Sequence, residues 1–301
     1  MSNVHVPVLL KTIQGVLAEQ FGKEELTVFD GTLGGGGYSA AFLEAGHEVY
    51  GSDLDAAVVE TLNRQFKVQK FEALQGNFSE IIGRFENGFF DVIVADLGYS
   101  SNQLESSRRG FSYLQPEEAL DLRYDSNRGE AAYWLINRLS ESELAGVLYR
   151  NAGESLANRV ARELKRQPVE TVAEVVTGVE RAIPAKFFKK RNAILSRVWQ
   201  ALRIEVNAEF EHLQKFLEIS LEKLKPGGLL MIVNFHSLED KLVTKFMRAQ
   251  ARPVSEDMYG NRTHAYEFLT KKGLLPSPEE VEANVRARSA TLRVLRKLQL
   301  N

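Results

Sequence analysis

The sequence predicts an open α/β fold with a mostly parallel sheet and a helical insertion. Up to residue 97, apolar runs typical of strands alternate with amphipathic segments typical of helices. The strand-like runs lie at 26–30, 47–53, 71–76 and 90–97. Strict alternation of this kind favours a doubly wound parallel sheet. From residue 103 to about 207 the helical pattern continues without a convincing strand. We therefore expect a sheet domain of residues 1–104 and 207–301 and a helical insertion of residues 105–206.

The individual elements follow from periodicity and from turn residues. Helices are predicted beside the first strands, within the insertion and after it, at 38–46, 54–67, 78–85, 131–139, 141–149, 153–166, 171–183, 194–206, 210–224 and 238–250. Pro226 and the two glycines after it end the helix at 210–224, and a buried strand follows at 229–235. The alternating run at 290–298 predicts an antiparallel edge strand that pairs near 266–270.

A glycine cluster and three acids lie where the predicted strands end. Asp30 ends the first strand, and Gly31 and the glycines at 34–37 follow it. Such a turn lets the backbone approach a nucleotide-like ligand closely, although the spacing is not a clean G-x-G-x-x-G. Asp53 follows the cluster by about 20 residues, where a carboxylate would bind ribose hydroxyls. With Asp96, these residues predict an adenosine-containing cofactor at the carboxyl edge of the sheet, held in part by Asp30 and Gly34. The alternative is a flexible turn with acids that cap helices.

The segment 96–101 carries a second chemical signal. It places Asp96, two turn residues and Tyr99 at a strand end, which is typical of enzymes that methylate amino groups of nucleic acid bases. The acid would accept a hydrogen bond from the exocyclic amine, and the aromatic ring would stack on the extruded base. A capped turn with a surface tyrosine would give the same pattern.

A third group of polar residues follows the strand at 229–235. Asn234 and His236 stand at its end, so either is a candidate to line the pocket, and Ser237 is expected to cap the next helix. A second histidine does not lie nearby in sequence, so no metal site is expected.

The insertion contains a basic run interleaved with aromatics. Lys186, Lys189, Lys190 and Arg191 flank two phenylalanines, and Arg197 and Arg203 follow. Cations beside aromatic rings suit phosphate contact and base stacking, which predicts RNA binding here. A solvated helix face is the ordinary alternative.

Composition narrows the functional classes. The net charge of −2 carries no global nucleic-acid signature, so any RNA contact must come from a local patch. The chain has no cysteine, which excludes disulfides and every mechanism with a thiolate nucleophile, including cytosine-C5 methylation. We see no signal peptide and no apolar run long enough for a membrane span, so a cytoplasmic enzyme without membrane contact is expected.

Together these motifs resemble the bacterial 16S rRNA cytosine-N4 methyltransferase family. The similarity spans nearly the whole chain and includes DGTLGGGGYS at 30–39, DLGYSSNQL at 96–104, QALRIEVNAE at 200–209 and NFHSLED at 234–240. It implies a class I (Rossmann-like) methyltransferase sheet with a helical insertion after strand four. It also implies S-adenosylmethionine as the cofactor, and N4-methylation of a decoding-region cytidine in 16S rRNA of the small ribosomal subunit.

The resemblance also implies roles for particular residues. Its cofactor contacts fall on Gly36, Gly37, Tyr38, Asp53, Phe78, Asp96 and Gln103. Asp53 would hold the ribose and Phe78 would pack on the adenine. From their positions at the strand ends, and not from the resemblance, we expect Asp96, Tyr99, Asn234 and His236 to form the catalytic pocket. A homodimer stays open.

The chain departs from the family pattern at Tyr38, at Tyr99 and at 193–196. A divergent paralogue that methylates another RNA is therefore one alternative. A non-catalytic RNA-binding module is a second alternative, and it would not need acids at the ends of three strands. A nicotinamide dehydrogenase is a third, and its glycine pattern would be cleaner.

Overall fold

The computed structural model describes residues 7–98, 107–256 and 258–299. The chain divides into two compact units, one formed by Met1–Gly98 with Glu211–Asn301 and the other by Tyr99–Phe210. We call the first the sheet unit and the second the helical unit, and each is described by itself. None of the described helices is long and apolar enough to cross a membrane.

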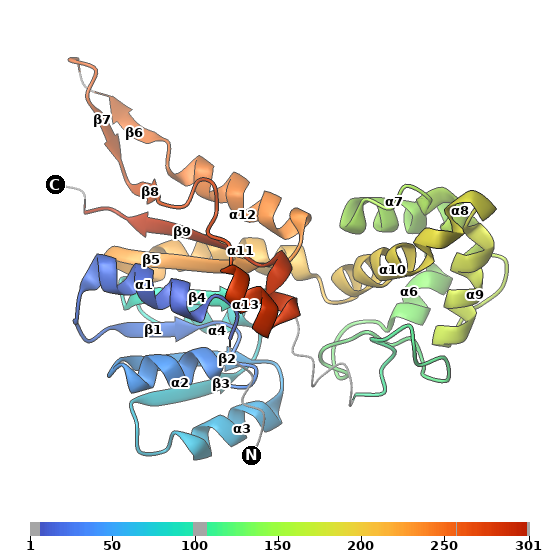
Figure 1. Cartoon of the computed structure of the whole chain (residues 1–301), viewed down its shortest axis with the longest axis horizontal. Helices are drawn as coiled ribbons and strands as arrows, with labels where there is room; N and C mark the ends of the chain where they lie inside the picture. Colours follow the sequence, from blue (N-terminus) through green and yellow to red (C-terminus); the bar gives the residue numbers. More distant parts are fainter. Residues whose placement is uncertain (1–6, 99–106, 257, 300–301) are drawn as a thin grey trace. The chain divides into compact units, whose positions relative to one another are not determined.

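In the described part of the sheet unit, seven strands form one sheet (Figure 1). Their order across the sheet is β3 (Phe71–Gln75), β2 (Glu48–Asp53), β1 (Thr27–Asp30), β4 (Phe90–Asp96), β5 (Leu224–Asn234), β9 (Thr291–Lys297) and β8 (Tyr266–Phe268). The first five run parallel, and β9 pairs antiparallel with both β5 and β8. The predicted open α/β sheet and its antiparallel edge pair are both confirmed.

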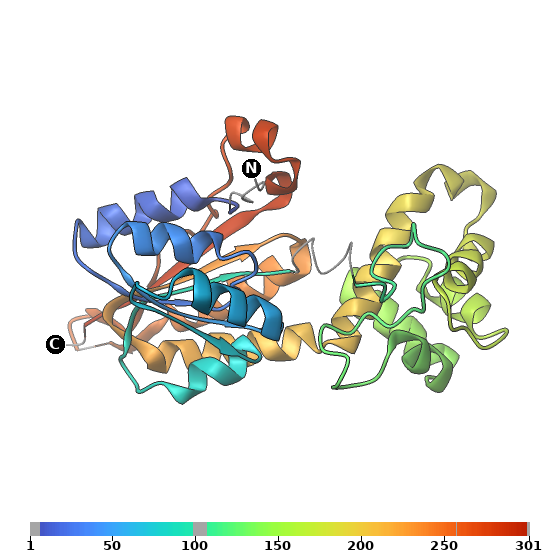
Figure 2. The same ribbon diagram turned by 90° about the horizontal axis from the view of Figure 1, so that it is seen from below.

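Helices cover both faces of this sheet. They are α1 (Leu10–Phe21), α2 (Gly37–Glu44), α3 (Ala56–Gln65), α4 (Phe78–Ile81), α11 (Glu209–Lys223), α12 (Ser237–Gln250) and α13 (Pro278–Ala283), with 3₁₀ turns η1 (Ile82–Arg84) and η3 (Val285–Ser289). Figure 2 shows α1 and α2 in blue on one side, and α4 and α11 in teal and yellow on the other. Helices α1 and α13 lie outside the predicted elements.

Side-chain alternation along the strands explains the two layers. In β4, Val92 and Val94 pack with Ile13 of α1 and Phe42 of α2. Ile93, between them, belongs to the cluster on the opposite face, together with residues of α11 and α12. Because successive side chains of a strand point to opposite faces, one apolar run serves both cores.

Strand β5 begins earlier than its predicted start at residue 229. Leu224 already pairs with Phe90, and the next pair is Val92 with Leu229. The intervening residues form a bulge in which Gly227 has φ 85°, a conformation that favours glycine. The predicted end of the preceding helix is confirmed, because α11 stops at Lys223.

A separate two-stranded ribbon follows α12. It pairs β6 (Pro253–Glu256) with β7 (Arg262–His264) in antiparallel register. In Figure 1 it extends away from the main sheet. Its residues in β6 are all exposed.

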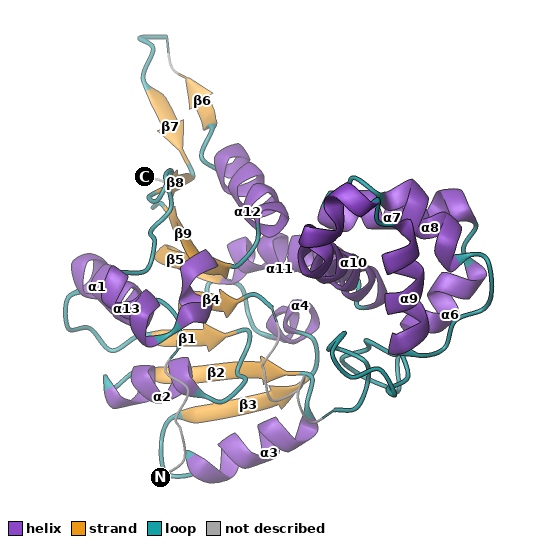
Figure 3. Cartoon of the chain, turned by 45° about the vertical axis from the view of Figure 1, so that its right-hand side comes forward, coloured by secondary structure: helices purple, strands orange, loops and turns teal. Residues whose placement is uncertain are grey.

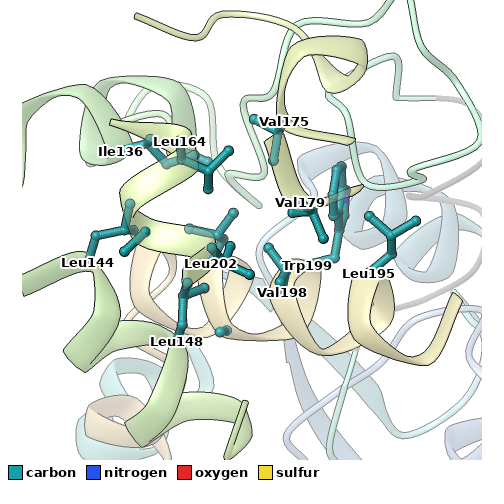
Figure 4. Packing of buried hydrophobic residues seen from close by; sticks show 14 of the residues in the cluster. Ile136, Leu144, Leu148, Leu164, Val175, Val179, Leu195, Val198, Trp199 and Leu202 are labelled. Carbon is teal, nitrogen blue, oxygen red and sulfur yellow. The ribbon is translucent and has the colours of Figure 1, made fainter. Parts of the chain in front are cut away.

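The helical unit consists of helices and turns around one apolar core. Its elements are α6 (Ala132–Arg138), α7 (Glu141–Ala152), α8 (Ala157–Leu164), α9 (Val172–Ala182), η2 (Ala185–Lys190) and α10 (Arg191–Val206). Figure 4 shows Leu148 of α7, Val179 of α9 and Leu202 of α10 meeting in this core. Within 107–210 the pairing of strands is limited to one isolated bridge, between Ala119 and Thr171, so the predicted helical character of this stretch is confirmed.

Candidate active site

The structure brings the three predicted acids to one edge of the sheet. Asp30, Asp53 and Asp96 are the last residues of β1, β2 and β4. In register, Asp30 lies opposite Gly51 of β2 and Val94 of β4. Asp53 therefore lies two residues further along the strand direction than Asp30 on the β2 side. Asp96 lies two residues further on the β4 side.

Asp30 is fully buried, and its carboxylate is hydrogen-bonded within the sheet unit. Its Oδ2 accepts from Ser39 Oγ at 2.8 Å, and its Oδ1 accepts from the Thr32 amide at 3.2 Å. Burial raises the pKa of Asp30 to about 6, although these hydrogen bonds act in the opposite direction. Removal from water disfavours the charged form, and here this effect is the larger one.

Asp96 presents an unsatisfied acceptor at the end of β4. Its amide donates to Thr32 Oγ1 at 2.7 Å, which ties the strand end to the turn after β1. Its Oδ1 is buried and has no hydrogen-bond partner among the described residues. Burial, together with the charges of Asp30 and Glu239, raises the pKa of Asp96 well above its ordinary value. A buried oxygen without a donor is costly, so this atom is suited to a donor that a ligand brings.

The glycine turn and Asp53 are held together by a hydrogen bond. The Gly34 amide donates to Asp53 Oδ2 at 2.9 Å, and the Asp55 amide donates to Oδ1 at 2.9 Å. Burial raises the pKa of Asp53, and these amides oppose that shift.

Two of the glycines are required by backbone conformation or space. Gly34 and Gly36 have φ of 50° and 77°. A Cβ on Gly36 would lie 2.5 Å from Leu62 Cδ2. Gly37 is the first residue of α2, so free N–H groups of that helix lie beside the turn.

The two aromatic residues expected at the cofactor occupy different environments. Tyr38 is 4% exposed and packs in the core beside Phe42, and its hydroxyl donates to the Val8 carbonyl. Burial raises its pKa well above the ordinary value. Phe78 is only partly buried at the start of α4. It packs edge-on against Phe216, with 4.8 Å between the two ring centroids. Phe78 thus keeps an accessible surface, whereas the Tyr38 side chain is a core residue.

The expected helix cap at Ser237 is wrong. The N-cap residue of α12 is His236, whose Nδ1 accepts from the Glu239 amide at 3.3 Å. Glu239 completes the capping box, because its Oε2 accepts from the amides of Phe235 and His236. The histidine ring also lies 2.8 Å from Glu239 Oε1 through Nε2. His236 therefore has a structural role at the strand end, whatever else it does.

Asn234 is 1% exposed at the end of β5. Its Nδ2 donates to the Thr291 carbonyl at 3.3 Å, and its Oδ1 is buried without a hydrogen-bond partner in the described residues. The remaining predicted site residues, Tyr99 and Gln103, lie outside the described residues.

Three residues of this edge were not predicted from sequence. Thr32 and Ser39 connect the glycine turn to Asp96 and Asp30, and Glu239 anchors the loop after β5. For Glu239 a signal was present, because a polar residue followed by Glu three positions later is the capping-box pattern. For Thr32 and Ser39 only their proximity to the glycine cluster could have indicated a role.

In the helical unit, the lysines of the basic run at 186–191 are exposed to solvent. Lys186, Lys189 and Lys190 are exposed, as are Phe187 and Phe188 at 37% and 51%. Lys186 Nζ lies 5.0 Å from the centre of the Phe187 ring. None of the three lysines has an ion-pair partner within the described ranges.

The three predicted arginines are instead committed to acidic partners. Arg191 pairs with Glu180. Arg197 Nε donates to Glu154 Oε2 at 2.7 Å, and Glu154 is fully buried. The Arg203 guanidinium is 12% exposed and bonds both oxygens of Glu209, at 2.7 and 3.1 Å. These arginines stabilise the helical unit.

Comparisons with known proteins find a matching family model and similar sequences. The model of the MraW methylase family matches residues 2–298. Ribosomal RNA small subunit methyltransferase H of Syntrophotalea carbinolica is 38% identical over 286 residues, covering 89% of this chain and 91% of that protein. The protein of the same name from Rickettsia typhi is 35% identical and covers 99% of this chain and 100% of its own length. Among solved structures, an rRNA methylase from Streptococcus thermophilus is 13% identical, with a TM-score of 0.42 and coverage of 96% and 95%.

We predict that Asp30 makes stability depend on pH in an unusual direction. Its pKa is about 6 in the folded chain and 3.8 ordinarily, so the folded state binds more protons between these values. The free energy of unfolding should therefore fall as pH rises through this window, by about 2–3 kcal/mol for this group. Asp30→Asn removes the effect, so its stability relative to the wild type should grow from pH 4 to pH 7 in urea unfolding. Glu256→Gln, at an exposed carboxyl of β6, is the control and should show no such growth. A constant difference between Asp30→Asn and the wild type would contradict the prediction.

Proposed function

The chain belongs to the MraW methylase family, and we propose from that premise that it transfers a methyl group from S-adenosylmethionine to the N4 amine of a decoding-region cytidine in 16S rRNA. The small ribosomal subunit is the proposed substrate particle. One observation of the structure supports this proposal independently of the family. Asp96, at the strand end where an amino-methylating enzyme needs an acceptor, has a buried carboxylate oxygen with no donor among the described residues.

The sheet unit has the features that this cofactor requires. At Gly34 the position of a side chain is open beside the N-terminus of α2, and Gly36, with φ 77°, completes the turn by packing closely against Leu62. Each Asp53 oxygen accepts one amide hydrogen and keeps capacity to accept a ribose hydroxyl. Phe78 offers an accessible ring for the adenine. We assign these residues, with Gly37, to cofactor binding. The cofactor supplies an electrophilic methyl group.

Asp96 is the proposed group that orients the amine. The lone pair of the cytosine amine is delocalised into the ring, so accepting an N–H hydrogen bond raises the electron density on nitrogen. We propose that Asp96 Oδ1, which is buried without a partner in the described residues, accepts this bond. A carboxylate is a better acceptor than a carboxylic acid, but the raised pKa of Asp96 in the ligand-free chain disfavours the carboxylate. A positive charge nearby would favour ionisation, so the cationic cofactor and the acceptor role support each other.

Asn234 and His236 are proposed to act at a distance from the amine. Val233 packs with Val94 on one face of the sheet, and Ile232 belongs to the cluster on the other. Strand alternation therefore directs Asn234 to the face opposite Asp96. His236 is committed to capping α12. We propose that both residues position the loop that closes the pocket.

The exposed lysines of the helical unit are proposed to bind RNA phosphates. Lys186, Lys189 and Lys190 have no acidic partner in the part of the chain that the structure describes, and they flank two exposed aromatic rings. We assign RNA recognition to the proposed helical domain of residues 105–206 on this basis.

A divergent paralogue that methylates another RNA is the second candidate. Part of the segment 193–196 that departs from the family pattern lies inside the helical unit, where Ile194 is 2% exposed and Leu195 is fully buried. These two residues therefore belong to the core of the helical unit and not to the exposed basic run.

We predict that Asp53→Ala weakens cofactor binding at least tenfold. The variant loses two charged hydrogen bonds to ribose, each worth about 1.5–3 kcal/mol, and the anchor of the Gly34 amide. Titration calorimetry with S-adenosylhomocysteine measures the affinity, and circular dichroism checks the fold. Asp55→Ala, two residues further on, removes only the cap of α3 and should bind normally. Equal affinity of both folded variants would remove Asp53 from the site. No methyl-donor binding by the wild type would favour a non-catalytic RNA-binding module.

We predict that Asp96→Ala lowers the rate of methyl transfer about 10- to 100-fold, because one charged hydrogen bond to the amine is lost. Single-turnover methylation of unmethylated small subunits measures this rate, with cofactor affinity measured separately. Asp91→Ala is the matched control, since Asp91 lies at the other end of the same strand and bonds Thr27 and Lys225. Near-normal turnover of the Asp96 variant would move the amine-orienting role to another residue. Mass spectrometry of the modified nucleotide tests N4-methylcytidine directly.

We predict that K186Q/K189Q/K190Q weakens RNA binding and lowers its salt dependence. If the three lysines contact phosphates of a single strand, the slope of log affinity against log salt should fall by about 2. Affinity for S-adenosylhomocysteine should stay unchanged. The control R138Q/R150Q/R162Q removes three exposed arginines that already have acidic partners. A variant slope equal to that of the wild type would return the lysine run to an ordinary solvated surface.

A further inference from the structure

Helix α12 carries a stripe of cations on its outer face. Lys241, Lys245 and Arg248 are exposed, and exposed Arg252 follows just past the helix end. At 100° per residue, these four positions fall within an arc of about 60°. Val243 and Met247, which are buried in the core of the sheet unit, lie on the opposite side of the helix. We call the four cations the α12 stripe.

The α12 stripe lacks the ion pairs that several other surface cations of this chain have. Exposed Arg64 pairs with Glu60, Arg138 with Glu130, and Lys70 with Glu25. No residue of the stripe has an ion pair or a hydrogen bond with its side chain in the described ranges.

The helix provides no acidic residue beside the stripe that would neutralise its positive charge. For Lys241, Lys245 and Arg248, the residues three or four positions away are uncharged or are other cations of the stripe. Like charges at this spacing destabilise a helix. The acids of α12, Glu239 and Asp240, are occupied by the capping box and by Arg293. A repulsive row of this kind is relieved by an external anion.

The stripe connects the candidate active site to the exposed ribbon. Helix α12 begins directly after His236, at the edge where Asp96 lies, and Lys241 is one turn into the helix. Figure 3 shows α12 leading to the β6–β7 ribbon. From Lys241 to Arg252 the stripe extends about 16 Å. At its far end the ribbon exposes Tyr259, at 83%, and an exposed aromatic ring can stack on a base.

We propose that the α12 stripe binds the phosphates of the RNA strand next to the target nucleotide, so that the sheet unit has its own RNA surface. This inference rests on the proposed function. The Cβ atoms of consecutive cations in the stripe are about 5–6 Å apart. One RNA strand can therefore contact several of these cations together. The partner is a single polyanionic strand, because the cations form one narrow row and not a broad patch. The lysine run of the helical unit is a separate surface.

The test compares two variants with equal loss of charge. K241Q/K245Q/R248Q removes three cations of the stripe, whereas K23Q/K67Q/K70Q removes three exposed cations that precede β1 and β3, at the amino edge of the sheet. Binding to unmethylated small subunits is measured as a function of salt, and S-adenosylhomocysteine affinity is measured in parallel. We expect the stripe variant to bind at least tenfold more weakly at low salt, with a slope lowered by about 2. The amino-edge variant should behave like the wild type, and cofactor affinity should be equal in all three proteins.

Two outcomes would overturn the inference. One is a stripe variant whose affinity and salt slope equal those of the amino-edge variant. The other is competition by polyglutamate as strong as competition by RNA of equal charge, which would assign the stripe to acidic proteins. The proposed function fails in a different way, since the wild-type protein would then bind cofactor but would neither bind nor methylate small subunits.

Discussion

The ladder between β4 and β5 is the interaction on which the sheet unit and its candidate site depend. Strand β4 pairs with β1 on one side and with β5 on the other, from Val92 opposite Leu229 to Asp96 opposite Val233. The chain between the two strands includes the whole helical unit. Joining segments so far apart in sequence has an entropic cost that grows only slowly with loop length. The apolar residues of both strands pack in the cores on the two faces of the sheet, and their burial offsets this cost. A long insertion is therefore tolerated at the end of β4.

The same ladder gives the candidate site its electrostatic character. On one side of β4, pairing with β1 places Asp96 beside the strand that ends in buried Asp30, and on the other side the β4–β5 ladder brings Glu239 near enough to act on Asp96. Burial and like charges make ionisation unfavourable at this edge, so the ligand-free chain holds acids with raised pKa values. A cationic ligand that brings hydrogen-bond donors would relieve both penalties. The pattern is therefore more consistent with a binding site than with acids that only cap helices.

Pairing separates the cations of this chain into two groups. Arg197 and Arg203 are fixed against buried or partly buried acids inside the helical unit, where losing one partner would leave the other charge uncompensated. Lys189 and Lys241 belong to exposed groups without acidic partners in the described ranges. Both groups are basic residues in segments with a helical pattern, and that pattern does not show which of them meet an acid in the folded chain. The proposals for RNA contact rest on the second group.

The sequence by itself determined the alternation of strands and helices, the glycine turn and the acids at the strand ends, because these follow from local periodicity and turn chemistry. Asp30 and Asp96 lie where that pattern predicted. Only the tertiary structure decided that Tyr38 packs in the core, that His236 and not Ser237 caps α12, and where β5 begins. Each of these features depends on a distant hydrogen-bond partner or on which of two neighbouring residues takes a given position. The Tyr38 hydroxyl, for example, donates to a carbonyl 30 residues away. Periodicity indicates which face of an element is buried, but it cannot indicate which distant atom completes a hydrogen bond or an ion pair.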